Sequence, residues 1–215
     1  MSSEQAEFWD KRYRGEGFAF GTAPNAFLAS QARYLKPGLH ALVPGDGQGR
    51  NGVWLAQRGL VVDSVDISPL GVAASKELAK ARGVEVNARV GDLLTWDWPV
   101  DRYDVVAALY LHFLDSDRPQ MHHAMLDALK PGGVLILEAF SIEQLEYKKV
   151  HGSGGPKIAD MLYSEPKLAA DFANTAVLLM QETTVELNEG HRHKGPAAVI
   201  RAVVQKPRQA SDESA

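Results

Sequence analysis

Seven short apolar runs, separated by turn residues and by segments with helical spacing, organise this sequence. The clearest runs are residues 103–110 (YDVVAALY) and 133–139 (GVLILEA), and weaker ones cover 39–44, 60–66 and 84–90. Runs of this length without clean polar alternation are typical of strands that are buried on both faces of a parallel sheet. We therefore expect these five segments to be strands of one sheet.

Segments with helical spacing lie between these runs. Residues 51–58 form a short one, a second begins at Pro69 and ends near Arg82, and residues 118–129 form a third. Proline is favoured in the first turn of a helix, which supports the second start. Strands that alternate with helices in this way predict βαβ units and a doubly wound sheet.

The end of the chain has a different pattern. Residues 176–187 and 197–205 are two strand-like runs joined by 188–190 and a His-rich stretch, which predicts an antiparallel hairpin. The predicted fold class is therefore α/β, a Rossmann-like doubly wound sheet of seven strands, mostly parallel, with an antiparallel C-terminal hairpin strand.

The chain is expected to form a single domain over residues 1–207, because no linker or internal repeat divides it. Residues 140–163 have little periodicity and contain a Gly-rich stretch, so they are predicted to be a mobile loop, or lid, near the site. The tail, residues 208–215, is polar and is expected to fray.

Composition and charge narrow the function class. The formal net charge is -4, and no basic stripe marks a nucleic-acid or anionic-membrane partner. The chain has no cysteine, which excludes disulfides, thiolate metal sites and cysteine nucleophiles. No apolar run approaches the length of about 18 residues that a membrane helix needs. The N-terminus lacks the apolar core of a signal peptide. We expect a cytoplasmic enzyme or binding protein that acts on a small-molecule substrate, without nucleic-acid or membrane partners.

A glycine loop is the strongest local motif. Gly45, Gly47 and Gly49 alternate within residues 44–52 (PGDGQGRNG), after a predicted strand and before a predicted helix. Glycines at these places let the backbone turn tightly and approach a ligand, and the helix that follows directs its free N–H groups at that ligand. A plain strand-to-helix turn explains the same glycines, so both interpretations stay open on this loop alone.

Two acids favour a nucleotide-like ligand. Asp66 ends the next apolar run, about 20 residues after the loop, where a carboxylate accepts hydrogen bonds from ribose hydroxyls. Asp66 can alternatively cap the helix at Pro69, but Ser68 is better placed to do so. After the third run come Gly91-Asp92-Leu93, where the acid can accept from an adenine amino group while Leu93 packs on the ring.

The segment from Gly47 to Gly52 also matches the dinucleotide fingerprint, so an NAD(P)-binding oxidoreductase is an alternative. Asp92 is not required by that fold. A Tyr-x-x-x-Lys pair is also missing, because the residue four positions after Tyr147 is His151. Both points disfavour the oxidoreductase.

With these motifs in order, the chain resembles the class I S-adenosylmethionine-dependent methyltransferases. The resemblance rests on the glycine loop, Asp66, Gly91-Asp92-Leu93, residues 103–106 (YDVV) and residues 129–133 (LKPGG). Within the class, the chain looks most like the small tellurite-resistance and thiopurine methyltransferase group. The motifs behind this narrower resemblance are residues 8–13 (FWDKRY), 20–25 (FGTAPN), 189–195 (EGHRHKG) and Arg201.

The resemblance implies S-adenosyl-L-methionine as cofactor, with S-adenosyl-L-homocysteine as its product. It implies that the glycine loop lines the methionine part, Asp66 holds the ribose and Asp92 reads the adenine. It also implies that residues 1–36 form a helical cap over the cofactor, in which Arg12 pairs with the methionine carboxylate. The Trp9/Tyr13 pair can alternatively be simple packing along a helix. The predicted cofactor-binding residues are Arg12, Tyr13, Gly45, Asp46, Gly47, Gly49, Arg50, Asn51, Asp66, Ile67, Ser68, Gly91, Asp92, Leu93 and Leu109.

One position departs from the family pattern. Members often carry an acid two residues before the first glycine, and this chain has Val43 there. Asp46, inside the loop, is an alternative partner for the cofactor amino group, and backbone carbonyls are another.

Candidate catalytic residues follow the later strands. Tyr110 and His112 come directly after the fourth run, and His112 is predicted either to orient or deprotonate a substrate or to cap a loop. Arg201, in the last strand, is predicted to attract an oxyanion or to be solvated. His191 and His193 without a third nearby ligand make a poor metal site, so no metal is expected.

The function predicted from these residues is methyl transfer to a small nucleophile with a soft heteroatom, such as a thiol or a selenium or tellurium oxyanion. An O- or N-methyltransferase of a small metabolite is the alternative on the same scaffold. A cofactor-binding sensor without catalytic activity is a third possibility.

Overall fold

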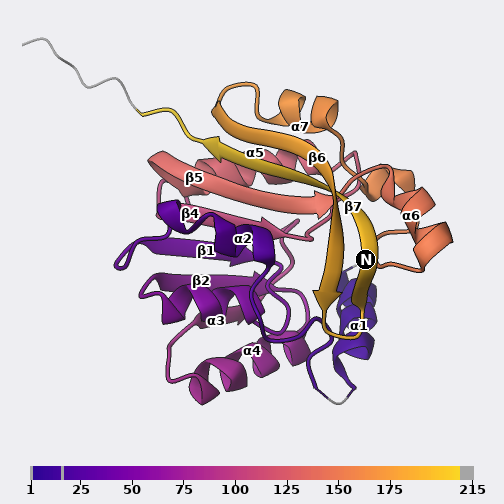
Figure 1. Ribbon diagram of the computed structural model, residues 1–215. Helices are drawn as coiled ribbons and strands as arrows, with labels where there is room; N and C mark the ends of the chain where they lie inside the picture. Colours follow the sequence, from indigo (N-terminus) through magenta and orange to yellow (C-terminus); the bar gives the residue numbers. More distant parts are fainter. Residues whose placement is uncertain (1, 16, 209–215) are drawn as a thin grey trace, which may run out of the picture.

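The computed structural model describes residues 2–15 and 17–208, which form one seven-stranded sheet between layers of helices (Figure 1). The strands are β1 (His40–Pro44), β2 (Val61–Asp66), β3 (Asn87–Val90), β4 (Tyr103–Leu109), β5 (Leu129–Phe140), β6 (Ala176–Glu189) and β7 (His193–Gln205). Their order in the sheet is β3-β2-β1-β4-β5-β7-β6. Strands β1 to β5 are parallel, and β7 runs antiparallel to both β5 and β6. The predicted fold class is confirmed.

Helices cover both faces of the sheet. They are α1 (Ser2–Tyr13), α2 (Ala26–Ser30), α3 (Arg50–Gln57), α4 (Pro69–Ala81), α5 (Arg118–Ala128), α6 (Gln144–His151) and α7 (Glu165–Asp171), with 3-10 turns at Ala32–Tyr34 and Ala159–Met161. The core on one face contains side chains of α2 and α3, and the core on the other contains side chains of α5 and α7. Helices α1 and α6 lie beyond the carboxyl ends of the parallel strands (Figure 1).

The centre of the sheet explains why the apolar runs lack alternation. On β4, Val105 packs into the core with α2 and α3, while its neighbour Val106 packs into the core with α5 and α7. Both side chains are fully buried. Successive strand residues point to opposite faces, so a strand covered on both sides needs apolar residues at every position.

The start of α4 shows which of two residues, Asp66 or Ser68, caps this helix. The Ser68 hydroxyl accepts a hydrogen bond from the Gly71 N–H at 2.9 Å, and Pro69 occupies the first turn. Ser68 therefore caps the helix, as an N-cap serine commonly does. Asp66, at the end of β2, is not needed for that purpose.

Residues 140–163 differ from the predicted loop, because they contain α6. This helix has little apolar periodicity, and its basic last turn carries Lys148 and Lys149, which suits the negative end of the helix dipole. Lys149 also pairs with Glu146 at 2.5 Å, and the helix ends at Gly152 in the left-handed conformation. Charged residues and a glycine cap mark this helix, so a search for hydrophobic spacing does not find it.

Residues 17–25, which we name the N-terminal strap, run between the glycine loop and the terminal hairpin. The Ala19 N–H donates to the Gln48 side chain at 2.7 Å, and the Ala19 carbonyl accepts from the Arg192 N–H at 3.3 Å. The predicted hairpin is confirmed, and its strands are longer than expected, so that the turn spans residues 190–192. The strap thus connects the glycine loop to the turn of the terminal hairpin.

Among the described residues, no helix is both long and apolar enough to cross a membrane. The described residues also hold no group of three or more His, Asp or Glu side chains arranged to bind a metal ion. The predicted fraying concerns mainly residues 209–215, which lie outside the described residues.

Candidate active site

The glycine loop adopts a backbone that side chains disfavour. Gly45, Gly47 and Gly49 have φ values of +67°, +55° and +89°, in the left-handed region that glycine enters without strain. A Cβ on Gly47 would overlap the Tyr13 hydroxyl, and a Cβ on Gly45 would lie 2.9 Å from Leu111 Cδ1. The loop is therefore a shallow cradle that must remain free of side chains.

Asp66 is tied to this loop. Its carboxylate accepts the Gly47 N–H at 2.7 Å and the Ser68 N–H at 2.9 Å, one on each oxygen. A carboxylate oxygen has two lone pairs, so each oxygen keeps one for another donor. Burial raises the pKa of Asp66, and the two N–H groups oppose that rise. This geometry leaves two adjacent acceptors at the carboxyl edge of the sheet, which suits a pair of vicinal hydroxyls.

The other predicted cofactor residues at this edge come from neighbouring strand ends. Asp92 follows β3 and is partly exposed, while Leu93 beside it is buried. The residues that the fold brings to the carboxyl ends of β1 to β4 are Gly45, Gly47, Gly49, Asp66, Ile67, Ser68, Gly91, Asp92, Leu93 and Leu109.

Helix α1 covers the loop. The Tyr13 side chain lies against Gly47 and Gly71, and its ring stacks on Trp9 at a centroid distance of 5.7 Å. Asp10 accepts a short hydrogen bond from the Ser68 hydroxyl, which ties α1 to the start of α4. The Trp9/Tyr13 pair therefore stacks along the helix, and Tyr13 also contacts the loop.

Arg12, which was predicted to pair with the cofactor carboxylate, packs against an aromatic ring. Its guanidinium carbon is 3.6 Å from the centroid of the Phe8 ring, and burial together with nearby Arg192 lowers the Arg12 pKa. Pairing of Arg12 with the cofactor carboxylate stays a prediction.

Asp46 is enclosed within the loop. Both of its carboxylate oxygens accept from the Gly52 N–H, at 3.3 and 3.2 Å, inside the first turn of α3. Burial raises its pKa to about 8, against the opposing hydrogen bond from Gly52. Asp46 thus supports the start of α3 from within the loop, and its alternative role as partner of the cofactor amino group stays a prediction.

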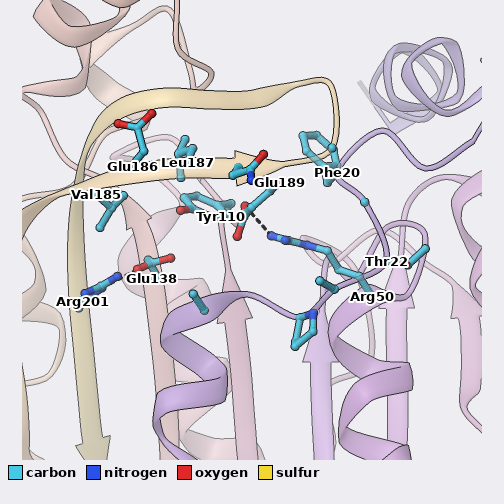
Figure 2. A pocket seen from close by; sticks show the side chains of 16 residues that line it. Phe20, Thr22, Arg50, Tyr110, Glu138, Val185, Glu186, Leu187, Glu189 and Arg201 are labelled. Carbon is cyan, nitrogen blue, oxygen red and sulfur yellow. Dashed lines mark hydrogen bonds and ion pairs between the residues drawn. The ribbon is translucent and has the colours of Figure 1, made fainter.

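A cavity of about 380 Å³ opens beside the loop (Figure 2). It is lined by the strap at residues 20–24, Tyr110 after β4, Glu138 of β5, residues 185–189 of β6 with Gly190 of the turn, and Arg201 of β7, together with Arg50. The cavity adjoins the cradle, because Arg50, which directly follows Gly49, lines it.

Arg50 and Asn51 face this side of the molecule. The Arg50 guanidinium donates to Glu189 at 2.9 Å across the cavity (Figure 2), and Asn51 accepts the Asn25 N–H of the strap at 2.9 Å. Both were predicted to bind the cofactor. The Arg50 side chain points to the terminal hairpin and the Asn51 side chain to the strap, and cofactor binding by these two residues stays a prediction.

Glu138 joins three walls of the cavity. It is 2% exposed, and its two oxygens accept from Asn25 Nδ2 and Arg201 Nε, each at 2.6 Å. Its backbone carbonyl accepts the Tyr110 N–H at 2.7 Å. Tyr110 has a φ of +54°, which is unusual for a bulky residue and is tolerated where surrounding contacts fix the backbone. Burial and the carboxylates of Glu138 and Glu189 raise the pKa of Tyr110 well above its usual value.

The position of His112 favours a structural role, as a loop cap, over a role as base. Its Nδ1 donates to the Met161 carbonyl at 2.7 Å, and its Nε2 accepts the Phe140 N–H at 3.3 Å. Burial lowers its pKa to about 4, so the ring is neutral. Both nitrogens are engaged with the backbone, which leaves no free base, and we infer that His112 joins the 140–163 segment to β5.

Glu138 was not predicted, and no role was predicted for Asn25 and Glu189, although they lie, like His193, in the motifs of the narrower resemblance. Glu138 had a visible sign, since it is a carboxylate within a fully apolar run (VLILEAF). A charge in a doubly buried strand must be paired, so it marks a network. The partners of Glu138 lie 113 and 63 residues away in the chain, and no local pattern reveals them.

Comparisons with known proteins agree with this geometry. Residues 41–133 match a family model described as a methyltransferase domain. These residues contain the glycine loop, Asp66 and Asp92. Residues 41–133 of this chain are therefore similar to a methyltransferase domain.

A curated relative shares part of this domain. The ribosomal protein L11 methyltransferase of Caldicellulosiruptor bescii is 33% identical over 100 residues, which are 44% of this chain. The match spans 31% of that relative, so about a third of its length is shared.

Solved structures show the same methyltransferase fold over nearly the whole chain. A structure described as "Conversion of a Disulfide Bond into a Thioacetal Group during Echinomycin Biosynthesis" has a TM-score of 0.75 and 22% identity, over 96% of this chain and 94% of that one. The magnesium protoporphyrin IX methyltransferase of Synechocystis PCC 6803 with bound S-adenosylhomocysteine has a TM-score of 0.69 and 18% identity, over 96% and 100%. TehB of Haemophilus influenzae has a TM-score of 0.67 and 17% identity, over 94% of this chain and 67% of that one. The likeness to TehB is a likeness of fold.

The residues around the glycine loop fit S-adenosyl-L-methionine, the cofactor that the sequence resemblance implies. The loop carries no side chain at Gly45 and Gly47, where Tyr13 and Leu111 lie against the backbone, and Asp66 offers two adjacent acceptors. Asp92 is accessible one strand further along. The dinucleotide alternative loses its support, because the matched family is a methyltransferase domain.

Proposed function

We propose that this protein transfers the methyl group of S-adenosyl-L-methionine to a small nucleophile with a soft heteroatom, held in the cavity beside the glycine loop. The observation that carries the proposal is the adjacency of the cradle and the cavity, which Arg50 lines directly after Gly49. A nucleophile in the cavity lies next to a cofactor on the loop, and alignment of the two is the main requirement of methyl transfer.

The size of the cavity supports a small molecule as acceptor. Small-ligand pockets usually measure about 300–1,000 Å³, and the volume of about 380 Å³ lies at the low end. The walls combine apolar side chains such as Leu187 with a few charged groups, which is the usual composition of such pockets.

When bound, S-adenosyl-L-methionine supplies a methyl carbon activated by a sulfonium cation. A lone pair of the acceptor forms the new bond to that carbon as the carbon–sulfur bond breaks, and the bonding electrons stay on sulfur. Asp66 holds the ribose in this proposal, Asp92 the adenine, and α1 with Tyr13 excludes water. Tyr110 forms the wall next to the acceptor and stays protonated, because its pKa is raised by burial and by nearby carboxylates.

Arg201 is proposed to attract an anionic acceptor. Glu138 holds its Nε, and its guanidinium carbon lies 4.9 Å from the centroid of the Phe27 ring. These two contacts fix the plane of the guanidinium while its terminal nitrogens make no hydrogen bond to a described residue. A planar two-donor edge suits an oxyanion or a thiolate.

The test is a direct assay of S-adenosylhomocysteine formation with matched acceptors. Alkyl and aryl thiols, selenite and tellurite form the soft panel, and catechols and primary amines form the hard panel. The proposal predicts turnover of soft acceptors, and a loss of anionic substrates in Arg201→Gln, with the exposed Arg33→Gln as control. Turnover of the hard panel alone supports the O- or N-methyltransferase alternative. S-adenosylhomocysteine binding without turnover of any acceptor favours a cofactor sensor.

A further inference from the structure

The turn of the terminal hairpin brings Glu189 and His193 together. They are the last residue of β6 and the first residue of β7, and they form a pair in the ladder. His193 Nδ1 lies 3.1 Å from Glu189 Oε2. A carboxylate only accepts, so Nδ1 carries the hydrogen, and in the neutral ring Nε2 carries the lone pair.

Glu189 is held as a carboxylate. Arg50 donates to the same Oε2 at 2.9 Å, and the side chains of Arg50 and Glu189 are 9% and 14% exposed. Burial opposes ionisation of Glu189, but the hydrogen bonds from His193 and Arg50 outweigh it and lower the Glu189 pKa. Glu189 is thus a fixed negative group behind the imidazole, an arrangement that orients a histidine base in many enzymes.

The ring of His193 lies next to the cavity. Its centroid is 4.5 Å from that of Phe20 and 4.7 Å from that of Tyr110, and both of these residues line the cavity. The ring is otherwise enclosed by Phe140, at 5.5 Å. His193 Nε2 has no hydrogen-bond partner among the described residues, in contrast to both nitrogens of His112. The ring lies directly behind the residues that line the cavity.

The glycine-rich part of the 140–163 segment lies over this ring. A Cβ on Gly154 would be 2.9 Å from His193 Cδ2 and 3.4 Å from Nε2. The Gly154 carbonyl accepts from Gln144 of α6 at 2.9 Å, which anchors the segment. A residue with a side chain at position 154 would collide with the imidazole, so glycine here permits a cover directly over the dyad.

We propose that His193, oriented by Glu189, accepts the proton of acceptors that arrive protonated, such as alkyl thiols. The inference rests on the proposed methyl transfer. The S–H proton moves to Nε2, the sulfur lone pair bonds to the methyl carbon, and the broken carbon–sulfur bond leaves its electrons on the departing sulfur. The imidazolium then returns its proton to water. Arg50, Glu189, His112 and Tyr110 are the charged or titratable groups around the ring.

The test compares two thiols that differ in ionisation at neutral pH. 2-Mercaptoethanol is protonated and needs a base, whereas 4-nitrothiophenol is already ionised and does not. His193→Gln is expected to lower kcat/KM for 2-mercaptoethanol by about 100-fold or more. The same variant is expected to change kcat/KM for 4-nitrothiophenol by less than about threefold. His191→Gln, an exposed histidine two residues away, is the matched control and is expected to leave both values unchanged.

Glu189→Gln tests the positioning residue through a readout that does not depend on activity. In protein with ¹⁵N-labelled histidine, His193 of the wild type is expected to be the Nδ1–H tautomer, and Glu189→Gln is expected to lose this preference. Equal losses for both thiols in His193→Gln, or no loss, would overturn the inference while the methyl transfer stands. A wild type that binds S-adenosylhomocysteine and methylates neither these thiols nor any other soft acceptor would overturn the proposed function itself. A protonated Nε2 in the wild type would exclude the base.

Discussion

Asn25 and Glu138 lie 113 residues apart in the chain, and a hydrogen bond of 2.6 Å joins their side chains below the cavity. Asn25 Oδ1 also accepts the Leu28 N–H at 2.8 Å, and the Asn25 N–H donates to Asn51. One asparagine thus caps α2, fixes the strap and satisfies a buried carboxylate.

Replacement of Asn25 by alanine is expected to destabilise the fold. It removes an N-cap and leaves one oxygen of the buried Glu138 without its donor, at a combined cost of about 2–4 kcal/mol. Urea unfolding measures the change, and Asn174→Ala, at an exposed turn, is the control with little effect. Equal stability of the two variants would mean that the Asn25–Glu138 bond contributes nothing measurable.

His112 is expected to remain neutral over the physiological pH range, because burial lowers its pKa to about 4. The unfolded chain binds a proton near pH 6.5, whereas the folded protein does not, so stability is full above that pH and falls as pH decreases toward 4. Histidine NMR is the direct measurement, and it should show an Nδ1–H tautomer with no titration above about pH 5. A His112 signal that titrates near pH 6.5 would contradict this assignment.

Gly47→Ala separates backbone strain from loss of the cradle. Gly83 also has a left-handed φ, of +67°, and a Cβ there meets nothing within 4 Å. Gly83→Ala should therefore cost about 1–2 kcal/mol of stability from strain alone and leave cofactor affinity unchanged. Gly47→Ala should cost more, because its Cβ overlaps Tyr13, and should weaken S-adenosylhomocysteine binding at least tenfold. If both variants bind equally well, the close approach at Gly47 is unimportant.

Most of the sheet was predictable from the sequence, because strands buried on both faces require continuous apolar runs. Val105 and Val106 illustrate this, since each enters a different core. The cradle and Asp66 were predictable as well, because their geometry depends on a few neighbouring residues. Helix α6 was not, because Glu146, Lys149 and a glycine cap specify it, and these leave no hydrophobic period.

The cavity network depends on long-range register, which explains what the sequence could not show. Arg201 meets Glu138 because β7 pairs antiparallel with β5 in one particular register, and a shift of one residue would turn Arg201 to the other face. Arg50 was assigned to the cofactor from its place in the loop. Its partner, Glu189, lies 139 residues away and becomes visible only in the folded chain.

The most direct test of the central claim is calorimetric titration of the wild type and Asp66→Ala with S-adenosylhomocysteine, NAD and NADP. The account predicts micromolar binding of S-adenosylhomocysteine, about 8 kcal/mol, and no response to either nicotinamide. Asp66→Ala should weaken binding strongly while Asp97→Ala, at an exposed position, binds like the wild type, with thermal unfolding to verify that each variant is folded. Nicotinamide binding without a response to S-adenosylhomocysteine, or an Asp66→Ala variant that is folded and binds unchanged, would contradict the account.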